Sequence, residues 1–260
     1  MSPTATFLEI VRSADRSDDL AIGALALAAH DHEVDVDHEL RRLDELALGC
    51  PEPTLEGLRR CLFVEAGFAG RTDDYYSPEN SFLDRVVDTR LGLPISLSVL
   101  MIEVGRRVGL DLVGVGMPAH FLVRSLHEPD RFVDPFHGGI EVDAAGCRAL
   151  FHGIAGPKAP FRSDYLRPVP TAAVLGRMAS NLVNAFRRRD DRAGMRWSAR
   201  LRSHCPGVGP GELIALSQAL SRSGAVDEAA DLIDRALPSL AGDEVDRWAR
   251  EAVRLRAQLN

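Results

Sequence analysis

The chain has 260 residues, of which 27% are charged, and its net charge is -7. This length allows one large domain or two small ones, with a core that needs neither disulfides nor metal. The acidic balance argues against sequence-independent nucleic-acid binding, which requires a basic surface, and does not favour acidic substrates. The sequence contains neither a secretory signal nor the roughly 18 apolar residues of a membrane span, so we expect a cytoplasmic protein.

The first part of the chain, residues 4–48, is predicted to form a helical cap. An acidic start at Asp18 and Asp19 suits a helix amino terminus, and leucines then repeat at helical spacing on both sides of an acidic link at 33–37. Three histidines surround this link: His30, His32 and His38. Because neighbours on a helix face are three or four residues apart, we interpret them as a solvated polar turn and not as a metal site.

An amphipathic helix is predicted over 54–67, with Thr54 as its cap and Gly67 at its end. Cys61 lies beside the apolar stripe of this helix, where we expect it to fill buried space. The chain has four cysteines without the spacing of metal ligands, and their even number does not by itself indicate disulfides in a chain of this length. They are Cys50, Cys61, Cys147 and Cys205.

A polar loop over 67–80 carries two adjacent tyrosines, Tyr75 and Tyr76. Their rings can anchor the loop to the core while their hydroxyls find partners, which is our first interpretation. The alternative is that they line a ligand or partner surface, together with Asn80 and Phe136.

The segment 80–139 is predicted to hold the centre of the fold. Pro94 suits the first turn of a helix that continues to Val108, and a helix that is apolar on nearly every side is a central one. Short strands are expected at 110–115, 121–123, 131–134 and 140–142, forming a small antiparallel sheet packed against this helix. The sheet carries His120 and Asp134.

The proline- and glycine-rich segment 153–170 is the best candidate for a linker. Beyond it, helical segments can be superposed with an offset of about 34 residues, which is the period of tetratricopeptide repeats, and the segment 216–238 looks like one such repeat. The chain therefore divides into a first domain at 1–152, a linker at 153–170 and a helical tail at 171–260, in the α+β class.

Several stretches resemble the SirB amino-terminal-domain family of bacterial proteins, whose members are mostly uncharacterised. They are GF at 67–68, DDYYSPENSFL at 73–83, RLGLPISLSVL at 90–100, GVGMPAHFLVR at 114–124 and FVDPFHGG at 132–139. The resemblance implies a transglutaminase-like, papain-like core with a helical cap before it and tetratricopeptide-like helices after it.

In the wider transglutaminase-like superfamily, the resemblance implies a catalytic cysteine at the start of the central helix, where this chain has Pro94. His120 and Asp134 match the base and the residue that orients it. We expect them to persist as a buried hydrogen-bonded pair that keeps two strands in register. Ser96, in the first turn of the helix, is the alternative nucleophile, although it points about 200° away from Pro94 on a helix of 3.6 residues per turn. Ser98 is a poorer candidate.

Three functions follow from these observations. The first is a non-catalytic transglutaminase-like protein, a pseudoenzyme that acts as an interaction or regulatory module and binds a protein or peptide through its tail. The second is a hydrolase or acyl- or amide-transferring enzyme that uses Ser96, His120 and Asp134. The third is a small-molecule pocket bounded by Tyr75, Tyr76, His120 and Phe136.

We expect neither a cofactor nor a metal. The segment Gly114–Gly116 lacks the third glycine of a dinucleotide-binding loop and precedes a strand, and no phosphate-binding loop or zinc-protease motif is present. His120 and His137 could form a metal pair only with further ligands, which the spacing does not offer. The partner and the oligomeric state are left open.

Overall fold

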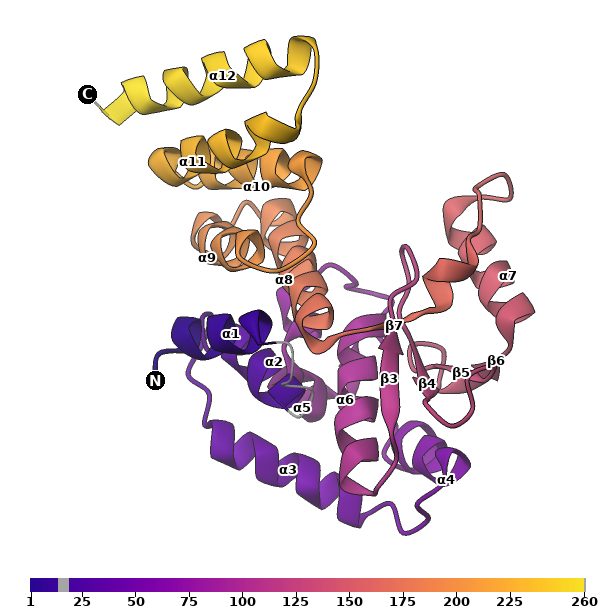
Figure 1. Cartoon of the computed structure of the whole chain (residues 1–260). Coiled ribbons are helices and arrows are strands. Elements are labelled where there is room, and N and C mark those ends of the chain that lie inside the picture. Colours follow the sequence, from indigo (N-terminus) through magenta and orange to yellow (C-terminus); the bar gives the residue numbers. More distant parts are fainter. Residues whose placement is uncertain (14–18, 260) are drawn as a thin grey trace.

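The computed structural model of the chain describes residues 1–13 and 19–259. It contains a helical layer, a five-stranded sheet and a stack of helices that extends away from both (Figure 1). The α+β class predicted from the sequence is confirmed. No helix in the described part of the chain is long and apolar enough to cross a membrane.

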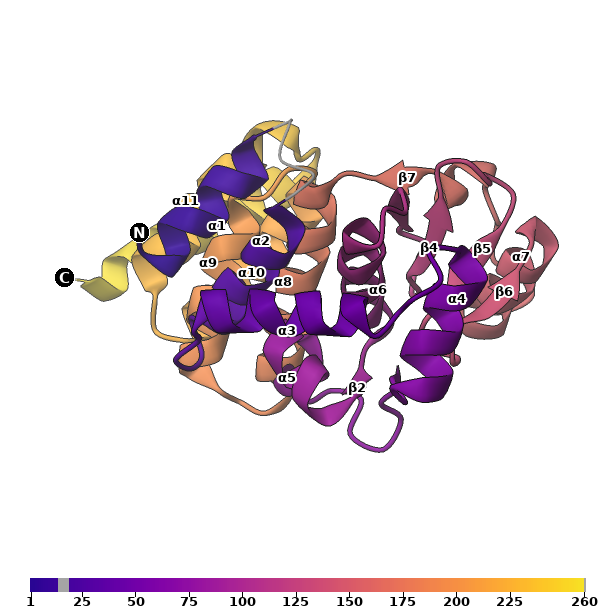
Figure 2. The same cartoon turned by 90° about the horizontal axis from the view of Figure 1, so that it is seen from below.

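The central element is helix α6, Pro94–Arg107, which begins at the predicted proline. Eleven of its fourteen residues are buried, as expected for a helix that is apolar on nearly all sides. Seen from below, α6 lies between the helical layer and the strands β4 and β5 (Figure 2). The helix thus links the two halves of the core.

The sheet runs in the order β6-β5-β4-β3-β7, and all neighbouring strands are antiparallel. Its two faces pack against different layers, because adjacent residues of a strand point to opposite sides. Leu122 and Phe132 face a cluster that includes helix α7, whereas Val123 and Val133 belong to the main core. The strands are β3 Leu112–Val115, β4 Leu122–Ser125, β5 Phe132–Asp134, β6 Ile140–Val142 and β7 Pro168–Val169.

The predicted helical cap forms, and the break before its last helix covers residues 29–35, near the acidic link that was expected at 33–37. Part of that prediction, residues 14–18 with Asp18, lies outside the described residues. Asp19 directly precedes the second helix. The helices that follow one another up to α6 are α1 Pro3–Arg12, α2 Leu20–Ala28, α3 Val36–Leu48, α4 Leu55–Arg59 and α5 Leu83–Thr89.

The prediction that the three histidines form a solvated turn was wrong for two of them. His30 donates from Nδ1 to the carbonyl of Ala26 (2.7 Å) and stacks on Trp197 (ring centroids 5.3 Å apart). His32 Nε2 lies 2.6 Å from a carboxylate oxygen of Asp84. The stacking on Trp197 and the contact with Asp84 join the cap to helices that are distant in sequence, which helical periodicity cannot reveal. His38 is exposed.

The amphipathic helix predicted over 54–67 forms, but as α4 followed by a π-helical turn, Arg60–Glu65. Thr54 caps it by accepting a hydrogen bond from the backbone N–H of Gly57 (3.0 Å). Arg59 donates to the carbonyl of Gly139 and pairs with Glu141, so that this helix holds the turn after β5 in place. A short parallel pair of strands, β1 Ala69–Gly70 and β2 Leu91–Gly92, follows beside it.

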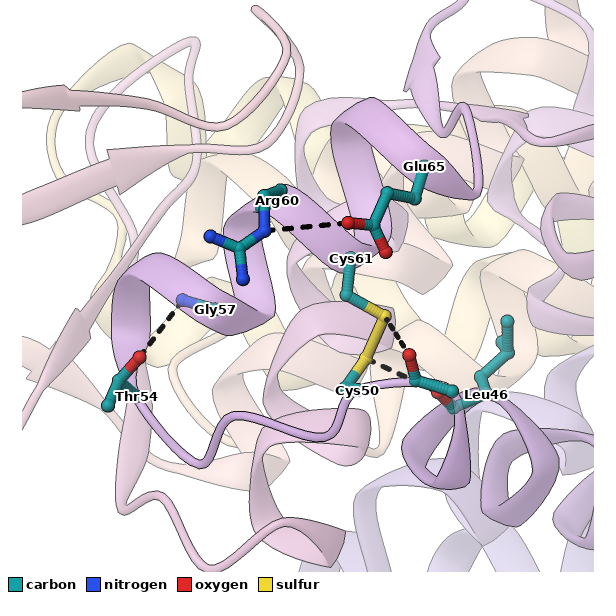
Figure 3. Close-up of a disulfide and its surroundings, with 8 residues drawn as sticks. Leu46, Cys50, Thr54, Gly57, Arg60, Cys61 and Glu65 are labelled. Atoms are coloured by element: carbon teal, nitrogen blue, oxygen red, sulfur yellow. Dashed lines mark hydrogen bonds and ion pairs between the residues drawn. A yellow bond between two sulfur atoms is a disulfide. The ribbon is translucent and has the colours of Figure 1, made fainter.

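Cys61 does not merely fill space, contrary to the prediction, because it forms a disulfide with Cys50 (Figure 3). The two Cα atoms are 5.5 Å apart, and the bond ties the loop after α3 to the π-helical turn. Sequence spacing could not reveal this pairing, because four cysteines allow several connectivities.

We expect this disulfide to stabilise the fold by about 2–3 kcal/mol, because it closes a short loop in the unfolded chain. Urea unfolding of the wild type with and without a reductant measures the effect. The double variant Cys50→Ser/Cys61→Ser is the control and should not respond to the reductant. An unchanged midpoint of the reduced wild type would contradict the expectation.

The segment 153–170, which was expected to be a linker, contains a strand that the sequence analysis missed. β7 pairs with β3 through Val169 and Pro168. The strand was missed because proline argues against a strand in general, although it is tolerated in an edge strand such as this one. Before it, Phe161 and Tyr165 pack on Phe151 of α7. The two helical elements here are α7 Ala144–Ala155 and the 3-10 turn Ser163–Leu166.

The tail consists of helices that stack in pairs away from the sheet (Figure 1). α8 belongs to the main core through Leu175 and Phe186 and also to a second core through Val183, which it shares with the helices that follow. α10 ends 34 residues after α8, and α11 begins 34 residues after α9. The helices are α8 Thr171–Arg188, α9 Arg192–Ser203, α10 Pro210–Arg222, α11 Val226–Ala236 and α12 Asp243–Arg256.

Candidate functional site

A cavity of about 510 Å³ lies where the start of α6, the turns at the edge of the sheet and helix α8 meet. This volume falls in the range of small-molecule sites, roughly 300–1,000 Å³. Its lining combines apolar and aromatic groups with a few polar side chains. The lining residues are Tyr75, Tyr76, Pro94, Ile95, Ala119, His120, Phe121, Phe136, His137, Ile154, Arg177 and Asn181.

His120 and Asp134 meet beside this cavity because of the register between β4 and β5. Val123 pairs with Val133, so the residues just before β4 lie next to the end of β5. His120 Nε2 donates to Asp134 Oδ2 over 2.7 Å, and both side chains are almost fully buried. The preceding Ala119 has a φ of 61°, a left-handed conformation that costs a non-glycine residue about 1 kcal/mol or more. The local fold therefore tolerates strain where it presents the imidazole.

The carboxylate of Asp134 accepts hydrogen bonds on both oxygens. Oδ2 also receives one from Nδ1 of His137 (2.7 Å), and Oδ1 receives the backbone N–H groups of Phe136 and His137 (3.1 and 3.3 Å). Burial alone would raise the pKa of this carboxyl group, but the hydrogen bonds and charges of His120 and His137 lower it below its ordinary value. Asp134 is therefore held as an anion.

Because its Nε2 is committed to Asp134, His120 has only Nδ1 left for the cavity. This atom makes no hydrogen bond to any described residue, and His120 lines the cavity together with Pro94. In a working triad, the atom facing such an imidazole nitrogen is the nucleophile. Pro94 lines the same cavity at the start of α6, where the resemblance implies the nucleophile.

Ser96 is not brought to His120. Its hydroxyl donates to the carbonyl of Asn80 (2.6 Å) and accepts from the backbone N–H of Leu93 (2.9 Å), so it serves as an internal cap of α6. The side chain is fully buried and is absent from the cavity lining. Ser98 is committed in the same way, donating to the carbonyl of Pro94 (2.7 Å).

Of the four residues expected at a ligand surface, the structure places three at the cavity. Tyr75 stands edge-on between Tyr76 and Phe136, with ring centroids 5.2 and 6.0 Å away. Asn80 is instead buried below the loop, where its amide donates to the carbonyls of Asp74 (2.6 Å) and Tyr75 (3.2 Å). It positions the tyrosines and does not face the cavity.

Two polar lining residues were missed in the sequence, because both belong to the predicted tail. Arg177 and Asn181 lie one turn apart on α8, a spacing that places them on one face. That spacing is visible in the sequence, but no local pattern tells that this face closes a cavity in the first domain. His137 was considered only as a metal ligand.

Three side chains could in principle hold a metal ion, because one ligand atom from each of His120, Asp134 and His137 lies within 4.8 Å of the other two. The sequence argument that the spacing offers no further ligand overlooked Asp134. In this structure, however, Nε2 of His120 and Nδ1 of His137 both form hydrogen bonds to Oδ2 of Asp134.

The two free thiols are not placed for nucleophilic chemistry. Cys147 and Cys205 are both buried. Burial raises the pKa of Cys147 to about 12 and that of Cys205 to about 11. A thiol in such a setting is protonated at neutral pH and therefore inert.

Comparison with known proteins relates the central part of the chain to one superfamily. The sequence profile of the Transglutaminase-like superfamily matches residues 22–180. This range contains every lining residue of the cavity except Asn181, which lies one position beyond it. No solved structure gives a significant match.

Relatives with similar sequences carry names without a stated activity. A UPF0162 protein of Xylella fastidiosa (strain Temecula1) is 40% identical over 145 residues, covering 54% of this chain and 52% of the relative. A UPF0162 protein of Vibrio cholerae is 32% identical over 137 residues, covering 52% and 50%. F-box only protein 21 of the mouse is 37% identical over 105 residues, covering 37% and 17%. The chain thus spans about half the length of the UPF0162 relatives it matches.

Proposed function

Because the chain belongs to the transglutaminase-like superfamily, we propose that it uses this fold to bind a ligand or partner without transforming it, as an interaction or regulatory module. The observation that carries the proposal is the composition of the cavity wall. Among the described residues, the wall includes no cysteine, serine or threonine. Acyl transfer of the transglutaminase type needs such a nucleophile next to the imidazole.

The pair of His120 and Asp134 has a structural role in this proposal. Two imidazoles and two backbone N–H groups converge on one buried carboxylate, which fixes the turn after β5 against the loop before β4. Both His120 and His137 line the cavity. The two imidazoles thereby become part of the wall that would contact a ligand.

The helical tail is proposed as the part that meets a protein or peptide partner. The 34-residue offset between equivalent helix ends supports a tetratricopeptide-like arrangement. Such arrays offer extended surfaces to peptides. Since α8 contributes both to this stack and to the cavity wall, a partner on the tail and a ligand in the cavity would share one helix.

The native protein should resist reagents that label catalytic nucleophiles. We expect no adduct with a fluorophosphonate, because the hydroxyl of Ser96 is bound to Asn80, and no adduct with iodoacetamide, because both free thiols are buried. Intact-mass spectrometry measures both reactions, and protein unfolded in denaturant serves as the positive control for the thiols. A fluorophosphonate adduct that disappears in Ser96→Ala would overturn the proposal.

A further inference from the structure

We propose that the cavity binds a carboxylate carried by an apolar or aromatic group, with Arg177 and Asn181 recognising the carboxylate. This inference rests on the proposed binding function and names the chemistry of its ligand. It depends on three features of the cavity: a cation without a partner, an amide beside it and an aromatic wall.

Arg177 has no ion pair and no hydrogen bond to any described residue, although it is half-buried and lines the cavity. Several other arginines of the tail are paired, such as Arg202, whose guanidinium binds Glu212 through two hydrogen bonds of 2.7 Å. Burial lowers the pKa of Arg177, Tyr75 acts in the opposite direction, and no carboxylate among the described residues forms an ion pair with it. An uncompensated cation that has lost part of its water is costly. An anionic ligand would remove that cost.

Asn181 adds a second group for the same anion. It follows Arg177 by one helical turn, lines the same cavity and has no hydrogen bond to any described residue. The guanidinium has a planar fork of donors that matches a carboxylate with two parallel hydrogen bonds. The asparagine amide can supply a third donor to the outer side of that carboxylate.

The other residues of the wall determine which chemical group should be attached to the carboxylate. Phe121 lies under the guanidinium (5.4 Å from its carbon to the ring centroid), and Tyr75 and Phe136, which stand edge-on to each other, belong to the same wall. Apolar side chains, Pro94, Ile95 and Ile154, line the same cavity, and the imidazoles of His120 and His137 lie at it as well. With one free arginine, the cavity compensates a single negative charge, which favours a monocarboxylate over a phosphate dianion.

Such a carboxylate can come from a free organic acid or from the carboxyl end of a peptide. The two sources share the recognition chemistry but differ in size, since a peptide has to continue out of the cavity past the exposed side chains of Tyr76 and Ile154. Matched probes distinguish them. Hydrocinnamate and its neutral amide test the free acid, and a hexapeptide ending in phenylalanine with a free or an amidated end tests the peptide.

Isothermal titration of the full chain with these four probes tests the inference. We expect one of the two carboxylate probes to bind about 10- to 100-fold more tightly than its amide, which is the worth of a charge-assisted hydrogen-bond pair. Arg177→Gln should abolish this preference, and Arg177→Lys should restore part of it. The control Arg187→Gln changes an exposed arginine of the same helix and should keep the wild-type preference.

Several outcomes would overturn the inference. They are equal affinity for carboxylate and amide, a preference that survives in Arg177→Gln, and no binding of any probe at millimolar concentration. Stronger binding of inorganic phosphate than of both carboxylates would also refute it, because a single arginine should not select the dianion. None of these results affects the proposed absence of catalysis, which is tested separately by the labelling reagents.

Discussion

Asp134→Ala should destabilise the protein by about 3–4 kcal/mol, a large fraction of the stability of an ordinary domain. The carboxylate is fully buried and accepts hydrogen bonds from two imidazoles and two backbone N–H groups. Its removal strands the ring N–H of His120, which is nearly fully buried, whereas the half-exposed His137 can turn to water. Urea unfolding followed by circular dichroism measures the loss.

The matched control for this variant is Asp130→Ala, which removes an exposed carboxylate from the turn before β5 and should change stability by less than about 0.5 kcal/mol. Asp134→Asn should fall between the two, because an amide keeps the shape and one acceptor. Equal stability of Asp134→Ala and the wild type would mean that the pair does not hold the two strands together.

The pKa of Asp134 determines how the stability difference between the wild type and an Asp134 variant depends on pH. The pKa of Asp134 in the folded protein is lowered below its ordinary value of 3.8. Its stabilisation is therefore fully present above about pH 4 and is lost as the pH falls through the lowered pKa. The stability difference between the wild type and Asp134→Asn should therefore be smaller at pH 3 than at pH 7.

The sequence predicted those parts of the fold that local patterns determine. Pro94 correctly marked the start of the central helix, because proline suits a first turn. The alternating strands around His120 and Asp134 were found, and their antiparallel pairing followed from the short turns between them. The pair itself was therefore predictable, as was the absence of a cysteine at the start of α6.

What the sequence could not reveal depends on contacts between distant segments. The contact of His32 with Asp84 joins residues 52 positions apart, and the disulfide of Cys50 required knowledge of which cysteine lies near. Arg177 was assigned to a separate tail, since the packing of α8 against the core leaves no local pattern in the sequence. The polar half of the cavity was therefore missed.

The second large effect is expected when the missing nucleophile is returned. In Pro94→Cys, the new thiol should face Nδ1 of His120 at the amino terminus of α6, and both the imidazole and the helix end favour the thiolate. Its pKa should fall below the ordinary value of about 8.5. Iodoacetamide should therefore alkylate it, with the thiolate sulfur displacing iodide, at least about tenfold faster at pH 6.5 than an exposed thiol, since each unit of pKa changes the thiolate fraction tenfold.

Two controls isolate the effect of His120 and of the position at the start of α6 on the reactivity of the new thiol. Asp130→Cys supplies an exposed thiol in the same protein, and His120→Ala in the Pro94→Cys background removes the imidazole. The buried Cys147 and Cys205 contribute little background, because their pKa values are about 12 and about 11.

The alkylation rate of Pro94→Cys as a function of pH, read by intact-mass spectrometry, is the most direct test that this cavity is a transglutaminase-like site with its nucleophile replaced by proline. The account predicts a fast reaction with a midpoint below about pH 8.5 that slows when His120→Ala is added. A rate equal to that of Asp130→Cys, or one that His120→Ala leaves unchanged, would contradict it.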